Sequence, residues 1–462
     1  MNTFSRNQDT RYGERGVTMV FVALAMVAII AVAALSIDVI TLYLAREEAQ
    51  RSADGAALAA ARVLSLSGVT GDPSNVQGSL SVAPWQAACD LARLAAQAVA
   101  SQNTIGRGLT NTPTVTFLYN GTATSDCSAG GAFATNPQVK VDVVQQGLPT
   151  FFSRIWRRSP SQVSATATAE AFNPSYSFSA PSGLVTVSPR CVKPWIVPNR
   201  DPGNGGAKLV SLTDGSIQNP GIHQSGTGVI GETFTLTADC KTGNPDCKWG
   251  SGLGLLNNPP TYNQQGAGTL DYVPALVVGT SMAFPTCATS NDYQEAIGGC
   301  DYGTVYACGI VGGGAQADLT FNPGKPGGET ATATQCLIHQ AGGQDTLDTA
   351  TNPFPFQIEA GPGNPMVIGG GLPANSIISS SSSILTVPIY DDTQAPGQLP
   401  INANQEPVTI VGFLQVFINS VDGNGNPNVT VLNVAGCSNT ATTSTPTVSG
   451  SSPVPVRLIT PQ

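Results

Sequence analysis

An unbroken apolar segment near the N-terminus constrains this chain more than any other feature. Residues 17–37 read VTMVFVALAMVAIIAVAALSI and contain no charged side chain. About 20 apolar residues in a helix cross the hydrocarbon core of a bilayer, where the backbone must satisfy its own hydrogen bonds. A cleaved secretory signal has a shorter apolar core and a small-residue cleavage site. Because a helical pattern continues beyond this run, the segment predicts one uncleaved transmembrane helix.

Charges and cysteines around this segment predict its orientation. Three arginines precede it and two follow closely, which is a weak positive-inside signal. All ten cysteines lie beyond it. Since disulfides form in oxidising compartments, we expect residues 1–16 to be a cytoplasmic tail. The rest of the chain then lies outside the cytoplasm, held by a single pass through the membrane.

The cysteines are expected to form up to five disulfides. They are Cys89, Cys127, Cys191, Cys240, Cys247, Cys287, Cys300, Cys308, Cys336 and Cys437. An even number in an exported chain indicates a disulfide framework, although spacing does not give the pairing. The close pairs Cys240/Cys247 and Cys300/Cys308 are candidates for local loops. The alternative is that some of the ten are buried free thiols.

The helix is expected to continue past the membrane over residues 38–66. This stretch contains no proline and one glycine, Gly55. Small apolar side chains recur at helical spacing along it, and rows of small residues let a second helix approach closely. We predict a helix-packing surface, or a route to a homo-oligomer, formed by Asp38, Ala49, Ala53, Ala56 and Ala60. The alternative is that this stripe packs on the rest of the chain.

Residues 14–61 carry a dense pattern of spaced motifs. Gly16 precedes the apolar run and Asp38 ends it. Then come Leu42-Tyr43, Arg46, Gln50 and the box A-D-x-A-A-L-A-A-A at 53–61. This pattern resembles the N-terminal region of TadG-like Flp pilus-assembly proteins, and the resemblance extends to about residue 172. It implies a long helix that leads a pilin-like α+β head, with other Tad, Flp or pilin-like proteins as partners.

Periodicity over residues 67–172 is compatible with such a head. Residues 85–102 predict an amphipathic helix, and alternating apolar residues over 115–119, 139–143 and 163–171 predict three strands. The string LPTFFSRIWRRS at 148–159 resembles the Pro-x-Phe-Phe helix of the same family. One departure is Phe21, which stands at the offset from Gly16 where pilin precursors carry Glu.

Residues 173–435 are expected to form a β-rich, disulfide-stapled ectodomain. Short apolar runs alternate with turn residues over 207–212, 233–237, 271–278, 304–311 and 384–390. The clearest prediction is a hairpin from 407 to 434 with the turn DGNGNPN at 422–428. A sandwich is one arrangement of such strands. Residues 436–462 read as a Ser/Thr/Pro-rich tail, with loops over 438–454, so the fold class predicted for the whole chain is α+β.

One string in the C-terminal region resembles an enzyme motif. Residues 279–285, GTSMAFP, are similar to the nucleophile motif of subtilisin-like proteases, with Ser281 as the nucleophile. That chemistry requires a base and an orienting acid within reach. His223 lies in a poor motif and no suitable Asp precedes it. We therefore expect no catalytic residue, and a secreted hydrolase is the least favoured function.

Two other strings are reminiscent of metal sites. Cys336-x-x-His339 is half of a zinc motif, but no second half is evident and exported cysteines usually pair with each other. Asp422-Gly-Asn-Gly-Asn resembles the start of a calcium loop, yet Pro427 and Asn433 occupy its sixth and twelfth positions. A hairpin turn is favoured there, and no metal or cofactor is predicted.

Charge and composition favour an envelope protein. The net charge is −9, with no basic cluster to attract nucleic acid. Our first hypothesis, which follows the resemblance, is a non-catalytic component of Flp-type pilus assembly, that is, tight adherence. It would be anchored in the bacterial inner membrane by a single pass, with a periplasmic or extracellular ectodomain. The alternative is a membrane-tethered adhesin or carbohydrate-binding module. Exposure of Trp195, Trp249 and Tyr262 on one face would favour the alternative.

Overall fold

The computed structural model describes most of the chain. The described residues are 14–66, 70, 83–106, 108–109, 112–119, 122–124, 136–148, 161–173, 186–213, 215–219, 221, 223, 228–238, 268–274, 287, 292–300, 306, 309–310, 326–349, 356–392, 409–437, 447–450 and 452–459. The chain divides into two compact units. Unit 1 comprises Met1–Ala56, Gln97–Thr114 and Val141–Ala167, and unit 2 comprises Ala57–Ala96, Val115–Lys140 and Thr168–Gln462.

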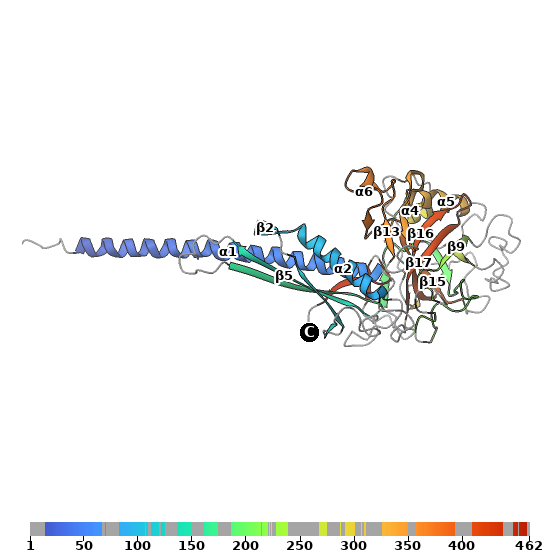
Figure 1. Ribbon diagram of the computed structural model, residues 1–462, viewed down its shortest axis with the longest axis horizontal. Coiled ribbons are helices and arrows are strands. Elements are labelled where there is room, and N and C mark those ends of the chain that lie inside the picture. The colour runs from blue at the N-terminus through green and yellow to red at the C-terminus, as the bar shows by residue number, and fades with distance from the viewer. Residues whose placement is uncertain are drawn as a thin grey trace, which may run out of the picture. The chain divides into compact units, whose positions relative to one another are not determined.

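The first element is the helix α1, Glu14–Leu66, which is unbroken over 53 residues (Figure 1). It is rich in Ala, Leu and other residues that form helices readily, and it has no proline to interrupt the hydrogen-bond ladder. The predicted helix over 17–66 is therefore confirmed. The amphipathic helix predicted at 85–102 is also confirmed as α2, Ala83–Ser101.

A five-stranded sheet follows α2 in the order β19-β6-β5-β3-β4. Its strands are β3 Thr114–Tyr119, β4 Thr122–Thr124, β5 Gln138–Leu148, β6 Ser161–Ala171 and β19 Val456–Ile459. The three predicted strands are confirmed as β3, β5 and β6. Most of the segment 148–159 that resembles a family helix lies outside the described residues. A two-stranded hairpin pairs β1 Thr104–Ile105 with β2 Gly108–Leu109.

The last strand of this sheet comes from far along the sequence. β19 pairs antiparallel with β6, with Val456 opposite Ala171 and Ile459 opposite Thr168. Arg457 donates to the buried Glu170 carboxylate at 2.6 Å, and its guanidinium lies 4.4 Å from the centre of the Phe172 ring. Another strand, β18 Thr447–Gly450, pairs in parallel with β7 Thr186–Pro189. The prediction of a loop over 438–454 is wrong at β18. There, pairing with β7 outweighs the Ser/Thr/Pro composition of the segment.

Seven strands of the C-terminal region form one sheet, and six of them close into a ring. They are β8 Trp195–Pro198, β9 Thr233–Ala238, β10 Thr269–Pro274, β11 Gly309–Ile310, β15 Ile384–Tyr390, β16 Thr409–Val421 and β17 Pro427–Gly436. Their order is β11-β16-β15-β8-β10-β9-β17, and β17 pairs back onto β16. Six strands therefore close into a mixed barrel, whose pairs β8–β15 and β9–β10 are parallel. The suggested sandwich is corrected, because this sheet closes on itself instead of packing on a second sheet.

Apolar side chains from every strand of the ring meet in its core. They include Trp195, Val197, Phe234, Leu236, Leu270, Tyr272, Val387, Ile389, Leu414, Val416, Val429 and Val431. The hairpin predicted at 407–434 is confirmed as β16 and β17 (Figure 1). Its turn approaches the start of α5, Pro326–Leu337. Gly425 has φ +77° there, and a Cβ on it would lie 2.0 Å from the carbonyl oxygen of Gly327. Only glycine fits both demands.

Shorter elements complete the described part of unit 2. They are α4 Asp292–Gly298, η6 Gln340–Gly342, α6 Pro365–Ile368 and a three-stranded sheet of β12 Thr346–Asp348, β13 Gln357–Glu359 and β14 Ile377–Ile378. The sequence does not predict α5, because PGGETATATQCL is poor in strong helix formers. Burial of Thr330 and Thr334 on this helix shows that tertiary packing stabilises it.

Candidate functional site

The N-terminal part of α1 exposes its apolar side chains. Val17, Phe21, Leu24, Ile30 and Ile40 are all at least half exposed, as are most large side chains between residues 17 and 44. Such a surface is unfavourable in water and favourable in lipid. By length and composition α1 is a candidate membrane span.

The predicted small-residue stripe is buried within the chain. Asp38 is 1% exposed, and Ala49, Ala53, Ala56 and Ala60 are fully buried. Within unit 1, neighbouring groups hold α1 against the segments that follow. The Glu48 carboxylate accepts from the Gly106 amide at 2.7 Å, and the Gln50 amide donates to the Thr166 carbonyl at 3.1 Å. A role of these five residues in packing on another protein stays a prediction.

The C-terminal end of α1 is fixed by a buried polar network within unit 2. Asn433 of β17 is fully buried, and its side-chain amide donates to the carbonyl oxygen of Ser65. The Thr70 hydroxyl donates to Asn433 Oδ1 at 3.3 Å, and the Asn173 amide donates to the Thr70 carbonyl at 2.6 Å. Helix ends leave carbonyl groups without helical partners. Here the Asn433 side chain satisfies one of them, the carbonyl of Ser65.

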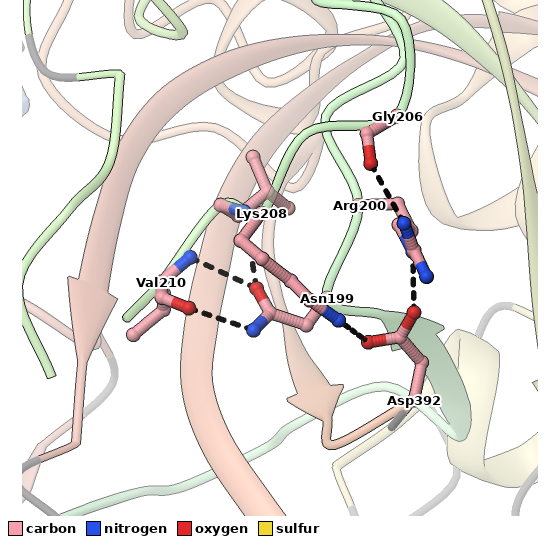
Figure 2. Close-up of polar contacts among 7 residues, drawn as sticks. Asn199, Arg200, Gly206, Lys208, Val210 and Asp392 are labelled. Carbon is pink, nitrogen blue, oxygen red and sulfur yellow. Dashed lines mark hydrogen bonds and ion pairs between the residues drawn. The ribbon is translucent and has the colours of Figure 1, made fainter. Parts of the chain in front are cut away.

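A charge cluster surrounds Asp392, which follows β15 (Figure 2). Its side chain is 1% exposed and accepts from Arg200 Nε and from Lys208 Nζ, the latter at 2.5 Å. Arg200 also donates to the Gly206 carbonyl at 3.0 Å. Asn199 fixes the neighbouring segment of the same polypeptide, because its side chain bonds to the backbone N–H and C=O of Val210 at 2.8 and 2.7 Å. The cluster thus locks the loop after β8 to the end of β15.

Lys193 is a buried lysine that lies just before β8 in the sequence. Its Nζ donates to the carbonyls of Ile297 and Gly299 at 2.7 Å each, and more weakly to that of Ala296. These carbonyls lie at the C-terminal end of α4, where the helix favours positive charge. Burial lowers the pKa of Lys193 to about 7. The adjacent disulfide Cys191–Cys300 joins the same two segments.

Two carboxyl groups meet in the loop between β8 and β9. Burial, together with the charge of Asp201 and a hydrogen bond to it, raises the pKa of Glu232 to about 9. Asp201 is fully buried and accepts from the amides of Gly203 and Asn204 and from Asn219 Nδ2. Glu232 Oε1 has no donor of its own. Glu232 is therefore protonated near neutral pH and shares its proton with Asp201.

The aromatic residues named as a possible ligand surface are not exposed where the structure describes them. Trp195 is fully buried, and its indole N–H donates to the Tyr293 hydroxyl at 3.1 Å. Tyr272 and Tyr293 both bond to the Thr330 hydroxyl, and burial raises the pKa of Tyr272 to about 12. Trp195 is thus a core residue. Trp249 and Tyr262 lie outside the described residues.

The structure tests the two metal motifs but not the enzyme motif. Ser281 lies outside the described residues, so the protease motif is untested; His223 is exposed and bonds to the Gly228 carbonyl at 2.9 Å. The zinc motif is ruled out for Cys336, which is bonded to Cys287. Asp422 accepts from the amides of Asn424 and Asn426 at 2.9 and 2.8 Å, which confirms a hairpin turn. Burial acts to raise the pKa of Asp422, but these hydrogen bonds outweigh it and lower the pKa.

Every described cysteine is in a disulfide. Cys191 pairs with Cys300 and Cys287 pairs with Cys336, while Cys89 and Cys437 are also bonded. The disulfide expectation is confirmed for these six. The candidate loop Cys300/Cys308 is wrong, because tertiary approach of two segments, not closeness in sequence, decides the partner of Cys300.

Sequence reasoning missed the polar residues that carry most of this geometry. They are Lys193, Glu232, Asp392 and Asn433. One signal was available, since charged side chains make up only 11% of the chain. A charged or amide side chain within a largely apolar run, such as Asn433 in VTVLNVAG or Lys193 in CVKPWIV, indicates a buried group with a dedicated partner.

Comparisons with known proteins bear on α1. No curated protein and no solved structure matches this chain. A family model does match, over a segment of α1 that ends about one turn before Leu66, the last residue of this helix. Residues 16–63 of this chain match the model of the Flp pilus-assembly TadE/G-like family (Tad).

Proposed function

We propose that this chain is a membrane-anchored, non-catalytic component of Flp-type pilus assembly. The observation that carries the proposal is the coincidence of two features in α1. Residues 16–63 match a Flp pilus-assembly family, and the part of this helix between residues 17 and 44 exposes large apolar side chains. An assembly component needs both an attachment to the membrane and a surface for its partners.

The proposed orientation places the N-terminus in the cytoplasm. Disulfides at Cys191–Cys300 and Cys287–Cys336 support an oxidising location for the remainder of the chain. Unit 2 then lies in the periplasm or beyond the cell. Partners in the pilus machinery meet the exposed side chains of α1, since the small-residue stripe is covered by this chain.

The proposal is tested in a bacterium that carries this chain beside a Flp locus. Ile30, 61% exposed within the apolar run, is changed to Lys. A charge at the centre of a membrane helix opposes insertion by about 2.5–3.5 kcal/mol. We expect Ile30→Lys to lower the membrane-bound fraction and the number of surface pili. The matched control is Glu47→Lys, an exposed position on the same helix beyond the apolar run, which should retain both.

Two results would contradict the proposal. Normal pili after deletion of the whole chain would remove the assembly role. An alkaline phosphatase fused after residue 462 that stays inactive, with an active fusion at the N-terminus, would reverse the orientation.

A further inference from the structure

Two buried carboxyl groups that the proposed function does not use meet in the loop between β8 and β9. Asp201 is fully buried, Glu232 is 4% exposed, and a hydrogen bond joins them. Within the described part of the chain, neither forms an ion pair with a Lys or Arg side chain. Buried charges in proteins are paired or coordinate metal ions. The pair is therefore a candidate site for a cation.

Glu232 carries an oxygen that the shared proton leaves unsatisfied. Its Oε1 is buried and accepts from no donor. The atom is directed at the turn that follows Asp201, because a Cβ on Gly203 would collide with it. A cation held by both oxygens of this carboxylate supplies the missing partner.

The two oxygens of Asp201 have separate surroundings. Oδ1 accepts from the backbone amides of Gly203 and Asn204 at 3.1 and 3.2 Å. Oδ2 lies 3.0 Å from Asn204 Nδ2 and 2.8 Å from Asn219 Nδ2. Oxygens bound at 2.3–2.6 Å to one calcium ion are about 3 Å apart. These side chains thus have the spacing of one coordination shell, and a half-turn about χ2 presents Oδ1 of each asparagine in place of Nδ2.

The turn allows an ion to enter. A bound ion touches its ligands directly, so it does not need a cavity large enough for water. Asn204 and Asn219 are half-buried, and Gly203 is exposed, so the turn borders solvent. Arg200 precedes Asp201 but is directed at Asp392, where its charge is paired (Figure 2).

We propose that this loop binds one calcium ion. The protein ligands are Asp201 Oδ2, both carboxylate oxygens of Glu232 and the side-chain oxygens of Asn204 and Asn219. Calcium displaces the proton that the two carboxyl groups otherwise share. An all-oxygen set of carboxylates and amides suits calcium, whereas magnesium keeps most of its water. This inference does not depend on the role in pilus assembly.

Isothermal titration calorimetry of the full chain in detergent micelles, freed of metal with EDTA, tests the proposal. We expect saturable binding of calcium with a Kd of about 10⁻⁴–10⁻³ M, the range of extracellular modules. Magnesium should bind at least about tenfold more weakly.

Variants assign the binding to this loop. Glu232→Gln keeps the shape of the side chain but removes its charge, and it should weaken calcium binding by about tenfold or more. Asp422→Asn is the matched control, because it removes the carboxylate of the other Asp-x-x-Gly-Asn-like turn, at 422–426. It should bind calcium like the parent.

Three results overturn the proposal. They are no saturable binding below about 10 mM calcium, ten times the weakest expected Kd, equal affinity for magnesium, and a parental Kd in Glu232→Gln. If Glu232→Gln does not fold, judged by its melting curve, Asn219→Asp decides. A third carboxylate in the shell should tighten calcium binding several-fold, since ligand charge sets the affinity; unchanged or weaker binding overturns the proposal.

Discussion

The side chain of Asn433 donates a hydrogen bond to the main-chain carbonyl of Ser65, 368 residues earlier in the sequence. The bond joins the middle of a barrel strand to the last turn of the N-terminal helix. It is fully buried, and Thr70 adds a second bond to the same amide group. The side chain of Asn433 therefore fixes the end of α1 within unit 2.

Replacing Asn433 with Leu should weaken the folded state measurably. The change leaves the Ser65 carbonyl and the Thr70 hydroxyl without their partner, and each buried orphan costs about 1–3 kcal/mol. We expect the free energy of unfolding to fall by about 2 kcal/mol or more, measured by urea denaturation of the full chain in micelles. Asn424→Ala, at the exposed hairpin turn, is the control. Equal stability of Asn433→Leu and the parent would show that the network contributes nothing.

Removal of the Asp392 carboxylate should be more damaging than removal of either cation. Asp392→Asn leaves Arg200 and Lys208 without their anion in a partly buried place. Breaking a buried pair from one side typically costs about 3–5 kcal/mol. Arg200→Ala should cost less, because Lys208 still pairs with the carboxylate. The reverse order in urea midpoints would contradict this account.

A surface ion pair provides the reference for that experiment. Asp90 and Arg93 pair at 2.5 Å on α2 with both side chains more than a third exposed. Such pairs contribute about 0–1 kcal/mol. Asp90→Asn should therefore leave the urea midpoint nearly unchanged.

The two described disulfides should contribute strongly to stability. They close segments of 109 and 49 residues. In the chain-entropy model, loops of this length are worth about 4–5 kcal/mol each. Replacing Cys287 and Cys336 together by Ser should lower the melting temperature, and so should replacing Cys191 and Cys300. Treatment of each double variant with reductant should lower it further, because the other bridges, including those of Cys89 and Cys437, remain to be broken. A melting temperature that is insensitive to both replacements would contradict the prediction.

Stability should fall as pH rises from 5 to 7, because of Glu232. Its pKa is raised in the folded state to about 9, from an ordinary value of 4.5. In this window the unfolded chain loses the proton and the folded chain keeps it, so rising pH favours unfolding. Lys193 has little effect there, since its lowered pKa of about 7 makes it titrate at higher pH, where it acts in the opposite direction.

The variant Glu232→Gln isolates this effect. Glutamine is neutral at every pH, so the slope of stability between pH 5 and 7 should become flatter. Urea titrations at pH 5, 6 and 7 measure it. A slope unchanged by Glu232→Gln would place the titrating group elsewhere.

Local patterns in the sequence predict the elements that depend on nearby residues. α1 follows from its composition, α2 from its apolar periodicity, and the hairpin of β16 and β17 from the turn at 422–428. The same is true of the buried stripe, because spacing alone places Ala49, Ala53 and Ala56 on one face. Spacing does not say what covers that face.

Long-range pairing is what the sequence does not predict. Asp392 meets Arg200 across 192 residues, and Lys193 reaches α4 across more than 100. Closure of the barrel depends on the parallel pairs β8–β15 and β9–β10, which have no turn between them to set their register.

The five-stranded sheet cannot be completed until the C-terminal strand β19 has been synthesised, because β19 pairs with β6. Glu170 and Arg457 are 287 residues apart, so a ribosome completes the barrel segment before it supplies the strand that covers this sheet edge. Until then residues 168–171 of β6, which β19 pairs with, are open to pairing with other chains. A nascent molecule therefore needs a holding factor or rapid synthesis. A product truncated before residue 456 would lack β19. Its edge of β6 would stay unpaired, and the product would be a natural target for proteases.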